Sequence, residues 1–283
     1  MLPGDSNEST AMRRMLLVAS LFSMLATGCG SQPQRPDSPH GHFLSRGIDV
    51  EGRHFRYQVF VPATAAAPGP QRPLVLFLHG SGERGDDGLK PTLAGLGPWL
   101  KQNMDSFPAL AVFPQVPEDE EWRGRNVRMA LAVLDATRAE FNADPRRIYL
   151  TGMSMGGYGS WELALAQPTR FAAVVPICGA LLAPRDERPG LLVDQLAGLP
   201  DPYTAAATRL NGVPLWMFHG ALDDLVPTTD DRAVFQASQQ LGAGFRYTEY
   251  PDTNHNAWDP TYRNPAMWQW LFAQQLPAPR SPR

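Results

Sequence analysis

Hydrophobic and polar positions alternate in the first part of the chain and then give way to continuous apolar runs. Two strand-like runs, Phe43–Val50 and His54–Val61, flank Gly52, and apolar residues in the second fall mainly on one alternating set. This pattern predicts a β-hairpin with one buried and one solvent-facing side. Five later runs are continuously apolar, which is typical of strands covered on both faces of a parallel sheet. They are Leu74–Leu78, Leu110–Phe113, Ile148–Leu150, Phe171–Ile177 and Val213–Phe218.

Stretches with helical spacing separate these runs. Val127–Phe141 repeats apolar residues at the helical period, and Thr228–Leu241 begins with polar residues and stops at a glycine. Met155–Ala166 predicts a third helix, and Phe245–Tyr250 predicts a further strand. Strands that alternate with helices form βαβ crossovers, so the pattern predicts one α/β domain. The longest part without a clear place in the sheet, 179–211, is open to two interpretations: a cap, or an irregular excursion over the site.

The composition is that of a folded globular protein, with 43% hydrophobic and 19% charged residues. Without the N-terminal segment described next, about 240 residues remain, which is enough for one large core. The formal net charge is −3, and no run of Lys or Arg is long enough to follow a phosphate backbone. Nucleic acid is therefore not expected as a partner.

The N-terminal segment has the features of a secretory signal peptide. Arg13 and Arg14 precede Met15–Gly28, an uncharged and mostly apolar stretch that is too short to span a bilayer as a helix. Residues 1–28 are therefore interpreted as a signal peptide, in which Met1–Ala11 is an upstream extension.

The end of this segment, Leu25-Ala26-Thr27-Gly28-Cys29, resembles the lipobox of bacterial lipoproteins. In that family the cysteine becomes the lipid-modified first residue of the mature protein. The resemblance implies a lipid anchor at Cys29, with 29–41 as a flexible tether and 42–278 as the folded domain. Membrane contact is then expected only through Cys29, and the protein is expected in the cell envelope. The alternative is a secreted protein in which Cys29 has no such role.

The strongest local motif, Gly152-Met153-Ser154-Met155-Gly156, matches G-x-S-x-G between a predicted strand and a predicted helix. In that context the serine takes a strained backbone on a very tight turn, which lifts its hydroxyl clear of the sheet. Side chains two residues to either side would collide, so glycine is needed there. Ser154 is therefore a candidate nucleophile. The alternative is a glycine-rich turn whose serine only caps a helix.

A serine hydroxyl is a poor nucleophile without a base, and the base needs a carboxylate that orients it. His255 follows the strand-like run that ends at Tyr250, in a loop able to bring an imidazole to the sheet edge. Asp223 and Asp224 follow another strand-like run. The chain order of Ser154, an aspartate and His255 is that of α/β-hydrolases and not of the other well-known serine protease folds.

Three further residues with chemically reactive side chains are expected to have structural roles. His79 and His219 each end an apolar run and precede glycine, and both are interpreted as histidines that shape a loop. Cys178 ends another apolar run and is interpreted as a small buried hydrophobic residue.

A serine hydrolase also needs backbone N–H groups for the oxyanion that develops on its substrate. The Met155 N–H, directly after the candidate nucleophile, is the first candidate. The second is the Ser81 N–H, in the glycine-containing loop His79–Gly85 after the first central strand. Such a loop can also cradle a phosphate, but this one lacks the Lys-Ser/Thr ending of a P-loop.

In this order, the motifs resemble the phospholipase/carboxylesterase branch of the α/β-hydrolases, a branch often described as predicted peptidases near the dienelactone hydrolases. The likeness covers about Arg72–Leu276. It implies the α/β-hydrolase fold, with a mostly parallel central sheet flanked by helices and an N-terminal antiparallel hairpin. It also implies hydrolysis of small-molecule or polymer-attached carboxylic esters, without a metal or a cofactor. The motifs that carry it are His79–Gly85, Leu150–Gly159, and His219-Gly220 with Asp223, Val226-Pro227 and His255.

The spacing in that family selects Asp223 over Asp224, because its carboxylate lies three residues after Gly220 and four before Pro227. Extracellular relatives include feruloyl and acetyl-xylan esterases, so a plant-polymer ester is one expected substrate. Two other functions stay open. A peptidase on the same three residues is disfavoured, because prolyl peptidases of this type usually carry a large additional domain. A non-catalytic binding lipoprotein is disfavoured by the intact set of serine, aspartate and histidine.

Overall fold

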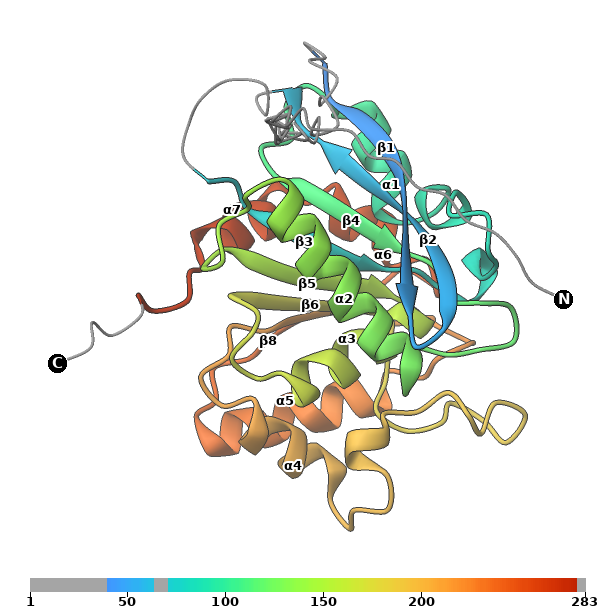
Figure 1. The fold of residues 1–283 in the computed structure, drawn as a ribbon. Coiled ribbons are helices and arrows are strands. Elements are labelled where there is room, and N and C mark those ends of the chain that lie inside the picture. The colour runs from blue at the N-terminus through green and yellow to red at the C-terminus, as the bar shows by residue number, and fades with distance from the viewer. Residues whose placement is uncertain (1–39, 64–70, 279–283) are drawn as a thin grey trace, which may run out of the picture. The chain divides into compact units, whose positions relative to one another are not determined.

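A computed structural model describes residues 40–63 and 71–278 of the chain. Within these residues eight strands form one sheet in the order β1-β2-β4-β3-β5-β6-β7-β8 (Figure 1). The hairpin β1-β2 and the pair β2-β4 are antiparallel, and every later neighbour is parallel. The strands are β1 (His42–Val50), β2 (Arg53–Val61), β3 (Leu74–Leu78), β4 (Leu110–Pro114), β5 (Ile148–Met153), β6 (Ala173–Ile177), β7 (Trp216–Gly220) and β8 (Arg246–Tyr250).

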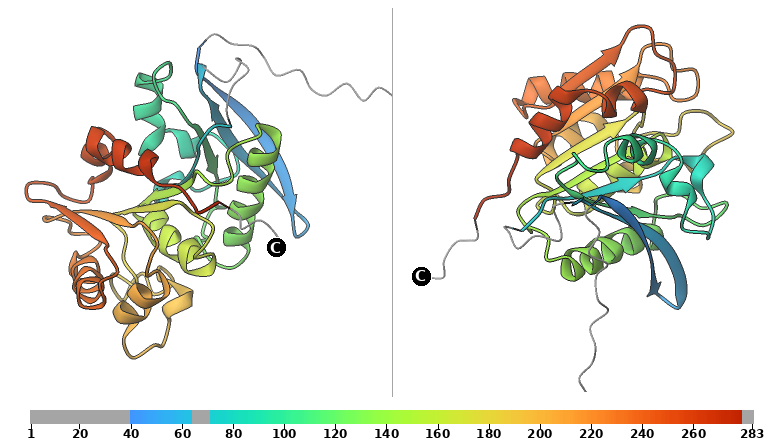
Figure 2. Two further views of the ribbon diagram at one scale, coloured as in Figure 1. Left: turned by 90° about the vertical axis from the view of Figure 1, so that its left-hand side faces the viewer. Right: turned by 90° about the horizontal axis from the view of Figure 1, so that it is seen from above.

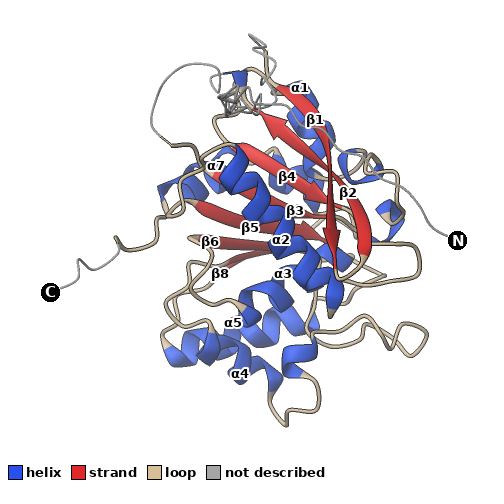
Figure 3. Ribbon diagram, viewed as in Figure 1, coloured by secondary structure: helices blue, strands red, loops and turns tan. Residues whose placement is uncertain are grey.

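Helices cover both faces of this sheet (Figure 2; Figure 3). One hydrophobic core lies under α2, α3, α4 and α5, and a second lies under α1, α6 and α7. The predicted α/β alternation and the α/β-hydrolase architecture are therefore confirmed. The helices are α1 (Leu96–Gln102), α2 (Arg125–Glu140), α3 (Met155–Ala166), α4 (Pro202–Arg209), α5 (Thr229–Leu241), α6 (Trp258–Tyr262) and α7 (Pro265–Ala273).

The continuous apolar run of β3 is explained by these two cores. Leu74, Leu76 and Leu78 pack into the first core, whereas Val75 and Phe77 pack into the second. Successive side chains of a strand point to opposite faces, so a strand covered on both sides needs apolar residues at every position.

Turn and cap residues have the backbone conformations that their sequence predicts. In the β1-β2 turn, Glu51 and Gly52 both have positive φ, 50° and 75°, as a two-residue hairpin turn of type I′ requires. Helix α5 ends at Gly242 in the left-handed conformation, with φ of 65°. Two strands begin later than predicted, β6 at Ala173 instead of Phe171 and β7 at Trp216 instead of Val213. In the second case Pro214, which lies between Val213 and Trp216, has no N–H to donate to a sheet ladder.

Segment 179–211 combines an irregular excursion with a helix. Its first half is a loop that reaches the candidate site, and its second half contains the turn Asp194–Leu196 and helix α4. Helix α4 packs against α5 (Figure 1). Of the two interpretations of this segment, the excursion therefore describes its first half.

The predicted signal peptide, Cys29 and nearly all of the predicted tether lie outside the described residues. Among the described residues, no helix is both long enough and apolar enough to cross a membrane.

Candidate active site

Strand register brings the candidate loops together at one edge of the sheet. Strands β3 and β5 pair with Leu78 opposite Gly152, so the loops that follow them leave the sheet side by side. Strands β7 and β8 pair with Gly220 opposite Tyr250, which places the loops of Asp223 and His255 next to each other. Ligand sites of open α/β sheets form outside these carboxyl ends of the strands.

Ser154 lies on a strained turn between β5 and α3, with φ of 54° and ψ of −121°. The turn is held because the Ser154 N–H donates to the Ile177 carbonyl, while the Ser154 carbonyl accepts from two N–H groups of α3. A Cβ at Gly152 would lie 2.2 Å from the Gly156 carbonyl oxygen, and one at Gly156 would lie 1.9 Å from the Leu78 carbonyl oxygen. Only glycine therefore fits at these two positions.

The structure brings Ser154, His255 and Asp223 into one hydrogen-bonded chain. The Ser154 Oγ lies 2.8 Å from His255 Nε2, and His255 Nδ1 lies 2.7 Å from Asp223 Oδ2. The Asp223 side chain has no exposed surface, and the His255 side chain is 14% exposed. This geometry allows the imidazole to take the hydroxyl proton while the carboxylate holds the opposite ring nitrogen.

Of the two adjacent aspartates, Asp223 is the one that contacts His255. Its Oδ1 also accepts from the N–H groups of Leu225 and Val226, each at 2.9 Å, which closes a turn around the carboxylate. Asp224 is exposed to solvent. The two neighbours therefore have different environments although the sequence sets them side by side.

The His255 loop is pressed against β7. A Cβ at Gly220 would lie 2.1 Å from the Asn254 carbonyl oxygen and 2.3 Å from that of Thr253. The His255 and Trp258 rings also lie perpendicular to each other, with centroids 5.6 Å apart. The close backbone approach and the aromatic contact both restrict the loop that holds the imidazole.

Both candidate oxyanion donors lie beside Ser154. Met155 begins α3, and a Cβ at Gly80, next to Ser81, would lie 3.6 Å from the Ser154 Cβ. Neither the Met155 N–H nor the Ser81 N–H donates to another group among the described residues. Both are therefore able to donate to a substrate oxygen at this position.

Arg188 is a residue of the site that sequence reasoning missed. It comes from the loop after β6, and its guanidinium donates to the Ser81 Oγ and to the Glu121 carboxylate, each at 3.1 Å. Glu121 also accepts from Arg84, so three charged side chains tie this loop to the loop after β3. The sequence carried no signal for this contact, because Arg188 lies in an irregular polar stretch.

A pocket of about 240 Å³ opens onto Ser154 and His255. Apolar side chains line much of it, among them Met153, Leu191 and Trp258. Glu83, Arg185 and Arg188 bring charge to the same pocket. In the part of the chain that the structure describes, no group of three or more His, Cys, Asp or Glu side chains is placed to hold a metal ion.

The two histidines expected to be structural are both fully buried, but they differ in their partners. His79 donates from Nδ1 to the Gly80 carbonyl at 2.7 Å, and its Nε2 accepts from the Val116 N–H at 2.9 Å. Burial lowers the pKa of His79 to about 4, so its imidazole is neutral. This fits the expected role of a histidine that shapes a loop.

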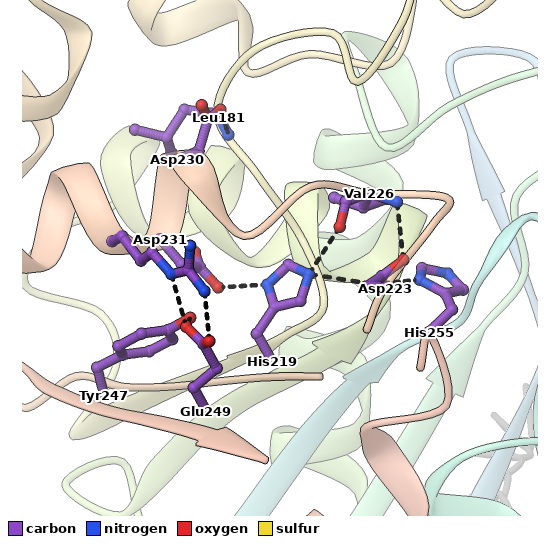
Figure 4. A network of polar contacts seen from close by, with 10 residues as sticks. Leu181, His219, Asp223, Val226, Asp230, Asp231, Tyr247, Glu249 and His255 are labelled. Carbon is purple, nitrogen blue, oxygen red and sulfur yellow. Dashed lines mark hydrogen bonds and ion pairs between the residues drawn. The ribbon is translucent and has the colours of Figure 1, made fainter. Parts of the chain in front are cut away.

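His219 instead lies between two carboxylates (Figure 4). Its Nε2 is 3.0 Å from Asp223 Oδ2 and 2.9 Å from the Val226 carbonyl oxygen, and its Nδ1 is 2.8 Å from Asp231 Oδ2. Burial disfavours the charged ring, but the carboxylates of Asp223 and Asp231 outweigh it and raise the pKa of His219 to about 10. The expectation of a loop-shaping histidine therefore leaves out its direct contact with Asp223.

Cys178 is buried as expected, directly after β6, and burial raises the pKa of its thiol.

Two aspartates at the start of α5 were not singled out in the sequence. Asp231 contacts His219, and Asp230 accepts from the N–H groups of Leu181 and Leu182, at the start of the loop that lines the pocket. Acidic residues are common in the first turn of any helix, so the sequence offered no specific signal.

Known proteins with a similar sequence or structure include esterases and a peptidase. The chain matches no protein-family model. It is 28% identical over 148 residues to "Putative esterase NocK" of Nocardia uniformis subsp. tsuyamanensis, a match covering 50% of this chain and 43% of that protein. It is 26% identical over 155 residues to Dipeptidyl-peptidase 5 of Porphyromonas gingivalis, covering 48% of this chain and 22% of the peptidase. Each match thus spans less than half of the curated relative.

The solved structure of a thermostable esterase superimposes with a TM-score of 0.66 and 28% sequence identity. That likeness covers 82% of this chain and 63% of the esterase chain. The mixed sheet with its N-terminal hairpin, the helices on both faces and these similarities agree with one another. The chain has an esterase-like α/β-hydrolase fold.

Proposed function

We propose that the protein is a serine hydrolase that cleaves carboxylic esters through an acyl-enzyme intermediate. The observation that carries this proposal is the hydrogen-bonded chain from Ser154 through His255 to Asp223, at a serine with a strained backbone. A helix-capping serine needs neither a histidine at 2.8 Å nor a strained φ. The esterases among the similar proteins support an ester as the substrate.

In the first half of the reaction, the Ser154 oxygen attacks the ester carbonyl while His255 Nε2 takes the hydroxyl proton. The oxyanion of the tetrahedral intermediate accepts from the N–H groups of Met155 and Ser81. His255 then gives its proton to the leaving alcohol, and the C–O bond of the ester breaks. In the second half, water attacks the acyl-enzyme with His255 again as the base, which releases the acid and restores Ser154.

The pocket supports a small group at the reacting centre. Its volume of about 240 Å³ lies below the range of about 300–1,000 Å³ that is usual for drug-sized ligands. Apolar walls such as Leu191 and Trp258 suit an alkyl or aryl group. We therefore propose short acyl or aryl esters, either free or attached to a polymer that extends into solvent.

A peptidase activity is the second candidate, and the similarity to Dipeptidyl-peptidase 5 favours it. The same three side chains are able to attack an amide. A matched pair of substrates, an ester and an anilide of the same acyl group, separates the two functions. We expect the ester to be hydrolysed far faster, and a faster anilide would reverse the proposal.

The decisive experiment replaces the nucleophile. We expect Ser154→Ala to abolish hydrolysis of p-nitrophenyl acetate and butyrate without changing the melting temperature. A fluorophosphonate probe should label the wild type at Ser154 and leave the variant unlabelled. Ser106→Ala, which removes an exposed loop hydroxyl, serves as the control and should keep full activity. Full activity of Ser154→Ala, or labelling at another residue, would overturn the assignment.

We also propose that Cys29 carries a lipid that holds the protein in the cell envelope. The support is the lipobox-like sequence, since this segment lies outside the described residues. The full chain produced in a bacterium should partition into detergent, and Cys29→Ser should move it to the aqueous phase. Equal partitioning of the two forms would contradict the lipid anchor.

A further inference from the structure

Both ring nitrogens of His219 face hydrogen-bond acceptors. The Nε2 is surrounded by the Val226 carbonyl oxygen and Asp223 Oδ2, and the Nδ1 faces Asp231 Oδ2 (Figure 4). The His219 ring has no exposed surface, and the Asp231 side chain is only 3% exposed. Water therefore does not replace any of these partners.

These partners determine where the protons of the ring lie. A carbonyl oxygen only accepts, so the Nε2 must carry a proton that it gives to Val226 and Asp223. The Nδ1 then either donates to an ionised Asp231 or accepts from a protonated one. Burial raises the pKa of Asp231, and the hydrogen bond and charge of His219 oppose that effect. We take the arrangement with a buried cation between two carboxylates, because each carboxylate then has an opposite charge within hydrogen-bond distance.

Asp223 depends on this neighbour. The carboxylate is fully buried, which by itself favours its neutral form. Hydrogen bonds from His219 and His255 outweigh that effect and hold the pKa of Asp223 below its usual range. Oδ2 receives both imidazole bonds, while two backbone N–H groups hold Oδ1. Without the His219 cation, the donors left to Asp223 would be His255 and the two backbone N–H groups.

Other charged groups near His219 are engaged elsewhere. Glu249 of β8 accepts from Arg232 and from the Tyr247 hydroxyl. Asp230, next to Asp231 on α5, is turned toward the loop after β6 and toward the Tyr203 hydroxyl. The phenol of Tyr158 and the thiol of Cys178 are buried near the carboxylates and stay neutral, because burial raises the pKa of each. Asp231 is thus the carboxylate that contacts the far side of the His219 ring.

We infer that His219 is a positioning residue, a buried imidazolium held by Asp231 that keeps Asp223 ionised and directed at His255. The hydrogen-bonded chain then extends over five side chains: Ser154, His255, Asp223, His219 and Asp231. The effect on catalysis that we infer rests on the proposed function. The positive charge of His219 does not depend on that function, because the charge can be measured in the protein without substrate.

Nitrogen NMR of the wild-type protein tests the charge directly. With ¹⁵N-labelled histidine assigned through the backbone, we expect both nitrogens of His219 to carry protons at about pH 8, well above the value of about 6.5 for a free imidazole. A His219 ring with one unprotonated nitrogen at this pH would overturn the inference. This measurement needs no variant and no substrate, so it stands even if Ser154 proves not to be a nucleophile.

Kinetics of Asp231→Asn and His219→Gln test the positioning role. Each amide can still form a hydrogen bond but carries no charge. We expect kcat to fall on the order of 10- to 100-fold with little change in KM, by analogy with other residues that orient a reacting group through a second one. The acid limb of kcat/KM should also move to higher pH, because loss of the His219 cation makes protonation of the hydrogen-bonded Asp223–His255 pair easier.

Asp224→Asn is the matched control, since it removes a neighbouring carboxylate that is exposed. It should leave kcat and the pH profile as in the wild type. A merely structural role of His219 would lower the melting temperature of its variants but would not move the acid limb. Wild-type kcat and an unmoved acid limb in Asp231→Asn would overturn the positioning role.

Discussion

Two His-Gly pairs, at the ends of β3 and β7, show how far the same dipeptide can diverge inside one protein. His79 and His219 are both fully buried at the same edge of the sheet. His79 has backbone partners and a pKa lowered to about 4, whereas His219 has two carboxylate partners and a pKa raised to about 10. Burial alone pushes a histidine toward neutrality, so the partners, and not the depth, decide the charge.

The loops after the two pairs also contribute differently to the candidate site. The loop after β3 offers a backbone N–H, that of Ser81, beside the candidate nucleophile. The loop after β7 offers side chains, because Asp223 contacts His255 and His219. Substitutions of side chains should therefore be harmful in the second loop and tolerated in the first, unless they remove the N–H.

The largest expected effect is that of Asp223→Asn in the loop after β7. An amide in place of the carboxylate leaves His255 in the wrong tautomer and without a counter-charge, so kcat should fall by up to about 10⁴-fold. Asp224→Asn should keep most of the activity. Purified side by side, the two variants are compared for kcat and melting temperature. If Asp224→Asn were the inactive one, the assignment of roles in this loop would have to be exchanged.

The next effect is expected in the loop after β3, from a pair of substitutions at Ser81. Ser81→Pro removes the backbone N–H, and loss of one oxyanion donor should lower kcat on the order of 10²- to 10³-fold. Ser81→Ala removes only the hydroxyl that accepts from Arg188, which should lower kcat/KM by no more than about tenfold. Steady-state kinetics on p-nitrophenyl butyrate measure both. Equal effects would mean that this loop acts through its side chain.

The pH dependence of stability should show the opposite shifts of the two histidines. His79 has a pKa of about 4 in the folded protein and of about 6.5 in the unfolded chain. Between pH 4 and pH 6.5, roughly, the unfolded chain therefore binds more protons at this residue than the folded protein does. The contribution of His79 to the free energy of unfolding is fully present above about pH 6.5 and is lost as the pH falls toward about 4. For His219 the contribution is complete below about pH 6.5 and is lost as the pH rises through about 10.

Urea unfolding at a series of pH values measures both contributions, each with a slope of at most about 1.4 kcal/mol per pH unit. His79→Gln should reduce the loss of stability on the acid side and leave the alkaline side unchanged. The double variant His219→Gln/Asp231→Asn, which removes the whole charge pair, should do the reverse. Identical pH profiles for the two variants would show that the two histidines do not differ in charge.

The smallest effect is expected from alanine substitutions at Gly80 and Gly220, the glycines of the two His-Gly pairs. A Cβ at Gly220 meets backbone carbonyls at 2.1 and 2.3 Å, whereas one at Gly80 first meets the end of the Glu83 side chain at 3.1 Å. Gly220→Ala should therefore lower the free energy of unfolding by about 1–3 kcal/mol, the usual range for overpacking. Gly80→Ala should change it by less than about 1 kcal/mol. Thermal unfolding of both variants measures these changes. An equal loss of stability in the two variants would contradict the close backbone approach at Gly220.

Local sterics and chain order made much of this protein predictable from its sequence. The G-x-S-x-G motif between a strand and a helix specifies the turn of Ser154. The collision that demands Gly152 is with the Gly156 carbonyl four residues away, whereas Gly156 is demanded by the Leu78 carbonyl of the neighbouring strand β3. The pattern of apolar residues predicted the hairpin and the parallel strands. A strand buried on one face alternates apolar and polar residues, and a strand buried on both faces is apolar throughout. Chain order then pointed to His255 and to the Asp223-Asp224 pair.

Contacts between distant elements were decided only by the tertiary structure. Asp231 of α5 and Arg188 of the loop after β6 are ordinary polar residues in the sequence, and they reach His219 and Ser81 only after the chain has folded. The charge of a buried imidazole depends on which acceptors surround it within about 3 Å, and periodicity carries no information about them. For that reason His79 and His219 look alike in the sequence and differ in the folded protein.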